Sequence, residues 1–156
     1  MPASAGLVLE LNNTLKFFKT TISIFDAGDA TFAPHPDLYT VAGHIAHVAD
    51  SVDWFVEGGF GKGWDMDFAQ AIAKAKAVTS LDEAKAWLER AFAHAATVVG
   101  QASDATLFEP IPDARIMEGA PRLAVVSGVM DHTAHHRGAL SVYARLLGKV
   151  APMPYA

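Results

Sequence analysis

The sequence predicts an all-α fold, a four-helix bundle formed by one domain over residues 1–156. Apolar residues recur at spacings of three and four over four long stretches, which is the period of a buried helix face. Glycine and proline residues separate these stretches, and strand-like alternating runs are missing between them. A chain of 156 residues can bury a core without disulfides, and this chain has no cysteine to form one.

The first two predicted helices cover residues 5–25 and 40–59. The stripe of the first is Leu11, Leu15, Phe18, Ile22 and Phe25, and the segment 27–29 is expected to end it. The second follows two prolines and begins at Thr40, whose hydroxyl can accept hydrogen bonds from free backbone N–H groups. Gly58 and Gly59 are expected to end this helix.

A short extra helix is possible over residues 67–78, between the second and third long helices. The third long helix is predicted for residues 80–102, because Ser80 and Glu83 match a capping box. Residues 103–120 contain two prolines and a glycine and are expected to form an irregular connection with room for a short extended pair.

The fourth long helix is predicted from Pro121 to Leu147, with Gly148 as its left-handed cap residue. Its apolar stripe contains two histidines four residues apart, His132 and His136, which therefore lie on one helical face. An imidazole among apolar groups needs a partner for its nitrogens, and the usual partners are a metal ion or a hydrogen-bond acceptor.

The second helix supplies a third candidate, His47, which shares a stripe with Ser51 and Trp54. Three imidazoles on two helices suit zinc, nickel, copper or iron(II) and suit calcium or magnesium poorly. His44 is the rival of His47, because it lies only about 60° around the same helix and can replace or support it. His135 is offset from the ligand stripe, so an exposed or interface position is expected for it.

Further side chains are candidates for the surroundings of a metal site. Substrate-pocket candidates are His44, Trp54, Tyr143 and Arg137, each with a structural alternative: a core position for the aromatic residues and an ion pair for Arg137. Trp64 can also wall the site. A carboxylate that accepts a hydrogen bond from a ligand ring would fix which ring nitrogen faces the metal, and three are candidates: Asp50, Asp53 and Asp131. The sequence identifies no catalytic residue.

Several classes of function are disfavoured. The net charge of −5 and the absence of clustered Lys and Arg argue against nucleic-acid binding. No apolar run approaches the roughly 20 residues that cross a bilayer, and the N-terminus lacks the pattern of a signal peptide, so a cytoplasmic location is expected. P-loop, dinucleotide-binding and His-Glu-x-x-His motifs are missing.

On two segments, His47-Val48-Ala49-Asp50 and His132 to Gly138, the chain resembles the DinB/YfiT-like metal-binding four-helix bundles. The resemblance implies an up-down-down-up bundle, frequent homodimers, and a divalent metal held by His47, His132 and His136. Relatives use low-molecular-weight thiols such as mycothiol or bacillithiol in S-transfer or isomerisation. Many members have glutamine where this chain has Ala139, so any substrate contact made by that glutamine is lost here.

The expected function is therefore that of a metal-dependent enzyme of the S-transferase or isomerase type. A bound ion, zinc or nickel in the first place and iron or copper otherwise, would acidify an external thiol that attacks an electrophilic small molecule. Two alternatives stay open: a metal-dependent hydrolase, and a noncatalytic metal-binding or stress-associated protein.

Overall fold

A computed structural model describes residues 2–155 of the chain. Its four long helices are α1 (Ala3–Ile22), α2 (Val41–Phe60), α4 (Leu81–Gln101) and α6 (Ala124–Leu146). Two short helices, α3 (Phe68–Lys76) and α5 (Asp104–Phe108), and two 3-10 turns, η1 (Ala27–Asp29) and η2 (Met117–Gly119), lie in the connections. Residues 2–155 contain no strand, and their one isolated bridge joins Pro110 to Pro121. The fold is all-α, as predicted.

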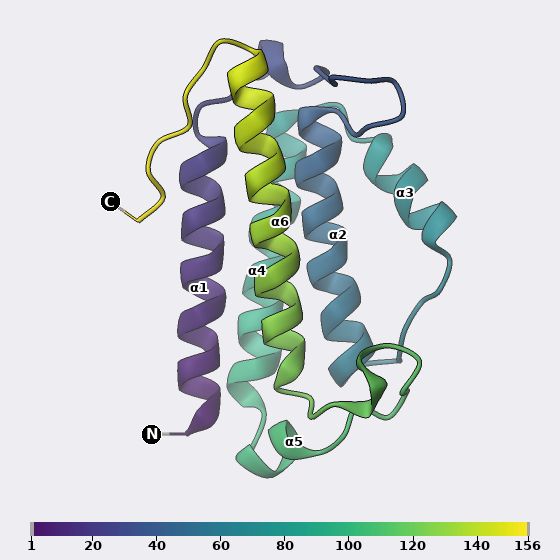
Figure 1. Ribbon diagram of the computed structural model, residues 1–156. Coiled ribbons are helices and arrows are strands. Elements are labelled where there is room, and N and C mark those ends of the chain that lie inside the picture. The colour runs from purple at the N-terminus through teal and green to yellow at the C-terminus, as the bar shows by residue number, and fades with distance from the viewer. Residues whose placement is uncertain (1, 156) are drawn as a thin grey trace.

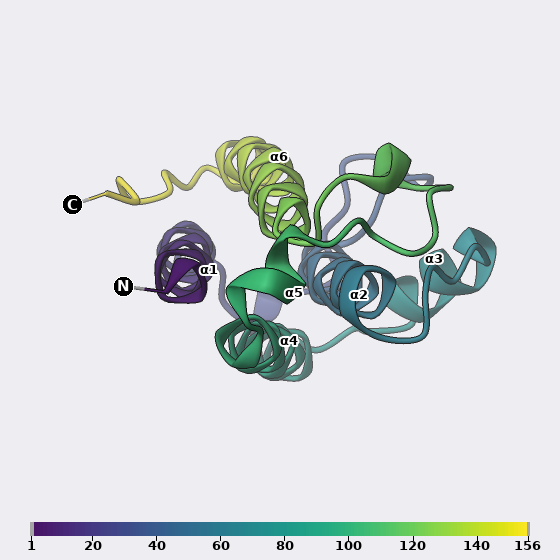
Figure 2. The ribbon, with the colours of Figure 1, turned by 90° about the horizontal axis from the view of Figure 1, so that it is seen from below.

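The four long helices lie side by side around a common core (Figure 1). Viewed from below, α1 and α2 occupy opposite corners, and each packs against both α4 and α6 (Figure 2). α5 lies beneath one end of the bundle, whereas α3 lies outside it against α2. Helix α2 is therefore covered by three other helices, and this position explains why most of its residues are buried.

The core contains the residues that the apolar periods indicated. Leu11, Phe18 and Ile22 of α1 are almost fully buried. In α6 the stripe residues Val125, Val129 and Leu140 are equally inaccessible. None of the helices in residues 2–155 combines the length and apolar character that a membrane crossing requires.

Three helix boundaries differ from those predicted. α1 ends at Ile22 and not at Phe25, although Phe25 still packs in the core. α2 continues through Gly58 and Gly59 to Phe60. These glycines serve close packing: a Cβ at position 58 would overlap the Trp64 ring, and one at position 59 would clash with Val125. They are places where other side chains approach the α2 backbone closely, and the helix ends one residue after them, at Phe60.

The start of α6 is the third difference. The residues just before Ala124 form backbone hydrogen bonds with the connection between α4 and α6. Arg122 N–H donates to Glu109 O, and Leu123 N–H donates to Leu107 O. The helix therefore begins after Pro121. Within that connection, α5 was not predicted, although Ser103 caps it by accepting from Thr106 N–H.

Other boundaries are confirmed. Thr40 caps α2 by accepting from Gly43 N–H at 3.0 Å, and the Ser80 hydroxyl accepts from Glu83 N–H at the start of α4. The short α3 lies within the predicted interval. Gly148 follows α6 with a φ of 74°, which glycine adopts without strain.

Candidate metal centre

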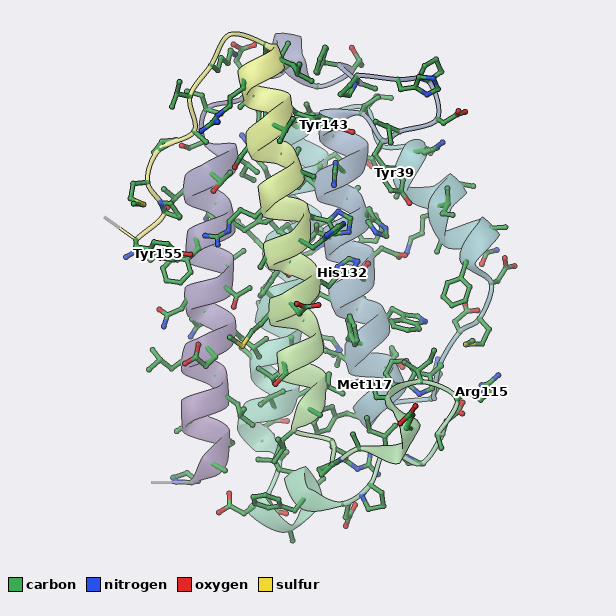
Figure 3. The ribbon with its side chains drawn as sticks, viewed as in Figure 1. Tyr39, Arg115, Met117, His132, Tyr143 and Tyr155 are labelled. Atoms are coloured by element: carbon green, nitrogen blue, oxygen red, sulfur yellow. The ribbon has the colours of Figure 1, made fainter. Side chains whose placement is uncertain are left out.

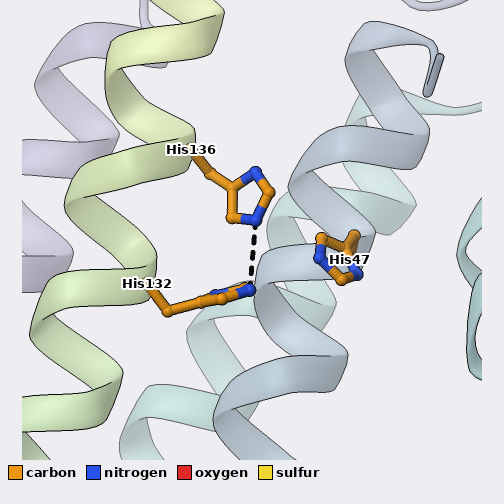
Figure 4. Close-up of side chains that lie close together, drawn as sticks. All are labelled: His47, His132 and His136. Carbon is orange, nitrogen blue, oxygen red and sulfur yellow. Dashed lines mark hydrogen bonds between the residues drawn. The ribbon is translucent and has the colours of Figure 1, made fainter. Parts of the chain in front are cut away.

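The three predicted ligands come together between α2 and α6. The His47 imidazole lies beside those of His132 and His136, with ring centroids 5.1 and 4.7 Å away (Figure 4). One ring nitrogen of each lies within 4.8 Å of the others, and none of the three side chains is exposed. Because one helical turn separates His132 from His136, their rings stack along one face of α6 and meet His47 across the helix interface.

The donor set fits a transition-metal ion. Nε2 of His132 and Nε2 of His136 are 3.1 Å apart, close to the roughly 3.3 Å that separates two nitrogens on one tetrahedral zinc ion. His47 is more distant, but it belongs to the same group of nitrogens. Three imidazoles without a thiolate or carboxylate make a site for zinc, nickel, copper or iron and not for calcium or magnesium.

His44 lies behind His136 and not within the triad. It is only 5% exposed, and its Nε2 is 2.6 Å from Nδ1 of His136. Its own Nδ1 is buried without a hydrogen-bond partner in the described structure. The sequence left open whether His44 replaces or supports His47; the group of neighbouring ring nitrogens contains His47 and not His44, and His44 contacts His136 instead.

Tyr39 contacts His47 on α2, as His44 contacts His136 on α6. The Tyr39 hydroxyl is 3.4 Å from Nδ1 of His47, and the two rings stack with centroids 4.8 Å apart. Sequence reasoning missed Tyr39, because it precedes the cap of α2 and reaches His47 only through the path of the loop. Tyr143 donates from its hydroxyl to Tyr39 O at 3.1 Å, so the core of the bundle fixes this loop (Figure 3).

Burial keeps these histidines neutral. It lowers the pKa of His44 and of His132 to about 4 and that of His136 to about 2, and the neighbouring imidazoles add to each effect. Burial also lowers the pKa of His47, although Asp50 opposes this shift. Near neutral pH all four rings are therefore unprotonated, which is the form that binds metal.

The sequence profile of the DinB family matches residues 18–156. The chain belongs to the DinB family. No curated protein is similar enough to the chain to be matched to it. Membership agrees with the resemblance seen in the histidine segments, and the matched interval contains the whole triad.

A cavity of about 460 Å³ opens beside the triad of this DinB protein, between α2 and α3. His47 and His132 line its inner end, and Tyr39, Trp54, Phe55 and Phe68 provide much of its wall. Its size suits a small organic molecule. A ligand in the cavity would therefore lie next to two of the three triad residues.

Of the residues predicted to surround the metal site of the DinB protein, some line the cavity and others lie in the core or on another side of the bundle. Trp54 lines the cavity. Tyr143 is 6% exposed, and its ring lies in the core 5.3 Å from that of His44. Arg137 lies on the α1 side of the bundle, where its guanidinium lies over the Phe17 ring and donates to the Tyr155 hydroxyl at 3.0 Å. Trp64 is buried and donates to Asp113 O.

The three candidate carboxylates have other partners or lie in solvent. Asp50 is paired with Lys74 at 2.7 Å, and Asp53 accepts from the Trp87 ring N–H at 2.9 Å. Asp131 is exposed. In the DinB protein the ring nitrogens of His136 and His47 that face away from the triad meet His44 and Tyr39 instead. His135 is exposed, as expected, with its ring 4.8 Å from that of His136.

Proposed function

We propose that this DinB protein is a metal-dependent enzyme that uses a low-molecular-weight thiol to attack an electrophilic small molecule, in a reaction of the S-transferase or isomerase type. The observation that carries the proposal is a group of three neutral imidazoles, two of which line a cavity large enough for a substrate. Three protein ligands leave coordination positions open, which is typical of catalytic sites.

His47, His132 and His136 are the residues that would hold the ion. When bound, a divalent ion supplies Lewis acidity, which lowers the pKa of a coordinated thiol. Because the chain has no cysteine, the thiol has to come from outside. Zinc and nickel are the ions proposed first for this all-nitrogen set, followed by iron and copper.

The remaining residues act on the ligands and on the cavity. His44 orients His136 through the hydrogen bond to its Nδ1, and the Tyr39 ring supports His47 by stacking on it. Trp54 and Phe55 present aromatic surface to the cavity beside the triad.

The bundle is proposed to have the up-down-down-up order of the helices. In support, α1 and α6 run toward one end of the molecule, whereas α2 and α4 run toward the other (Figure 1). This order brings the parallel pair α2 and α4 together and lets α6 meet α2 in antiparallel fashion. In that arrangement the two helices that carry the triad are neighbours.

Metal content is the first test. Purified protein, as isolated and after reconstitution, should contain about one divalent ion per chain by elemental mass spectrometry, and His47→Ala and His136→Ala should both lose it. The matched control is His94→Ala, because His94 is exposed on α4 away from the triad. Absence of metal from the wild type after reconstitution, or retention by both triad variants, contradicts the proposal.

Turnover is the second test. The metal-loaded protein is assayed with a panel of thiols and a chromogenic electrophile, with and without a chelator. Turnover that requires both thiol and metal is expected. Metal-dependent turnover without thiol would instead identify a hydrolase, and bound metal without exchangeable water on a cobalt-substituted sample would identify a noncatalytic metal protein.

A further inference from the structure

Acidic residues outnumber basic residues around the cavity beside the triad. Five acidic residues are among those that line it: Asp50, Asp53, Glu57, Asp65 and Asp67. Among the described lining residues, Lys74 is the only Lys or Arg, and its ammonium is already paired with Asp50 at 2.7 Å. The cavity therefore carries a strong excess of negative charge.

The other four carboxylates accept hydrogen bonds from neutral donors. Asp53 accepts from the Trp87 ring, and Glu57, Asp65 and Asp67 accept from the backbone N–H groups of Lys62, Asp67 and Gln70. These bonds orient the carboxylates but do not neutralise them. A concave site with charges of one sign over apolar walls concentrates the opposite charge from solution.

The apolar part of the cavity is aromatic. The ring centroid of Trp54 is 5.1 Å from that of Phe55 and 6.1 Å from that of Phe68, and all three residues line the cavity. Aromatic faces attract planar apolar groups, and they also attract cations through the ring quadrupole. The aromatic wall and the acidic residues therefore both favour a ligand with positive charge.

We propose that this cavity selects an aromatic molecule with a cationic group, such as a protonated arylalkylamine, over neutral and anionic molecules of the same shape. The proposal rests on the proposed function, because the cavity is taken to be the substrate site beside the triad. It narrows that function: the organic molecule that binds beside the metal carries positive and not negative charge.

The test compares three probes of similar size: 2-phenylethylamine, 2-phenylethanol and 3-phenylpropionate. Their dissociation constants are measured by titration calorimetry and by the NMR shift of the Trp54 ring N–H, at low and high salt. Zinc-loaded wild type and metal-free His136→Ala are both used, because His136 is not among the residues that line the cavity. Comparing the two distinguishes binding of the propionate carboxylate to the ion from a preference of the cavity itself. The amine should bind at least about tenfold tighter than the propionate at low salt, and high salt should reduce the difference.

A double variant tests whether the carboxylates cause the preference. Glu57→Gln with Asp65→Asn removes two charges, while the new amide oxygens still accept hydrogen bonds from backbone N–H groups. The matched control is Glu10→Gln with Asp82→Asn, which removes the same charges from exposed positions of α1 and α4 outside the cavity. The cavity variant should weaken amine binding several-fold, and the control should leave it unchanged.

Equal affinity for the three probes, tighter binding of the propionate to metal-free protein, or no saturable binding of any probe would each overturn the proposal. So would an equal loss in the cavity variant and in the control. These outcomes are separate from those of the metal tests. If no metal binds but metal-free protein still prefers the amine, the metal-dependent function fails and the cavity assignment stands.

Discussion

Nε2 of His44 lies 2.6 Å from Nδ1 of His136, on the side of the His136 ring opposite the triad. If Nε2 of His136 binds a metal, its ring proton has to be on Nδ1, which then donates to His44. The proton of His44 is then on its Nδ1, which has no partner in the described structure. His44 thus sets the tautomer of His136 at the cost of one buried unsatisfied N–H.

Replacing His44 by phenylalanine should weaken metal binding about 10- to 100-fold without removing a ligand, because His136 loses the acceptor for its Nδ1 proton. The affinity is measured by competition with a chromophoric chelator. His44→Gln, which retains an acceptor oxygen, should keep more of the affinity. Unchanged affinity in His44→Phe would mean that the hydrogen bond does not orient His136.

Acidification should destabilise the metal-free protein before the carboxylates protonate. The pKa of His44 and of His132 is about 4 in the fold, against 6.5 in the unfolded chain. Between these values the unfolded chain takes up protons that the folded protein does not, so the free energy of unfolding falls as pH falls. His44 alone gives a slope of up to about 1.4 kcal/mol per pH unit.

Urea unfolding at intervals from pH 7.5 to pH 4, in the presence of a chelator, measures this slope. In His44→Phe the slope should be smaller, because one of the titrating groups is gone. The lowered pKa values of Asp26 and Asp113 contribute only nearer to and below pH 4. A stability that stays constant down to pH 5 would contradict the neutral state of the buried histidines.

Gly58→Ala should destabilise the protein by about 1–3 kcal/mol, since the new methyl group would overlap the Trp64 ring, which packs on α2. Gly138→Ala is the matched control. A Cβ at position 138 of α6 meets nothing within 4 Å, so this change should stabilise the helix by about 0.5–1 kcal/mol. Thermal unfolding of both variants measures the difference, and equal effects would mean that Trp64 does not pack as described.

Metal binding should raise the thermal stability, because the ion would join α2 to α6. With free metal at about 1,000 times its dissociation constant, the folded state gains about 4 kcal/mol. Calorimetry with zinc and with a chelator should therefore show a rise in Tm that is lost in His136→Ala and kept in His94→Ala. A Tm that does not respond to metal would contradict binding to the folded state.

The sequence predicted the long helices well because the apolar residues of each recur at the helical period. The stripe of α1 and that of α6 both reach the core. The predictions failed where a distant part of the chain decides the local structure. The end of α2 was predicted to within one residue, but the close packing of Trp64 and Val125 against Gly58 and Gly59 was not. The start of α6 is delayed by backbone bonds between residues 107–111 and 120–123.

The triad was predictable for the same reason, since His132 and His136 lie on an apolar stripe and His47 lies on another. Its surroundings were not. Of the carboxylates suggested by proximity in sequence, Asp50 and Asp53 contact Lys74 and Trp87, and Asp131 is exposed. The ring nitrogens of His136 and His47 instead meet His44 and Tyr39. These contacts depend on the path of loops and on helix rotation, which a single sequence does not determine.

The metal triad and the outer wall of the cavity belong to different parts of the molecule. The triad is carried by α2 and α6, two of the four long helices of the bundle, whereas α3 lies outside the bundle and packs on α2. Exposed residues of α3, such as Phe68 and Ile72, line the cavity without contributing to the core. Evolution can therefore change which molecule enters by altering a nine-residue helix, while the ligand set and the fold that positions it are retained.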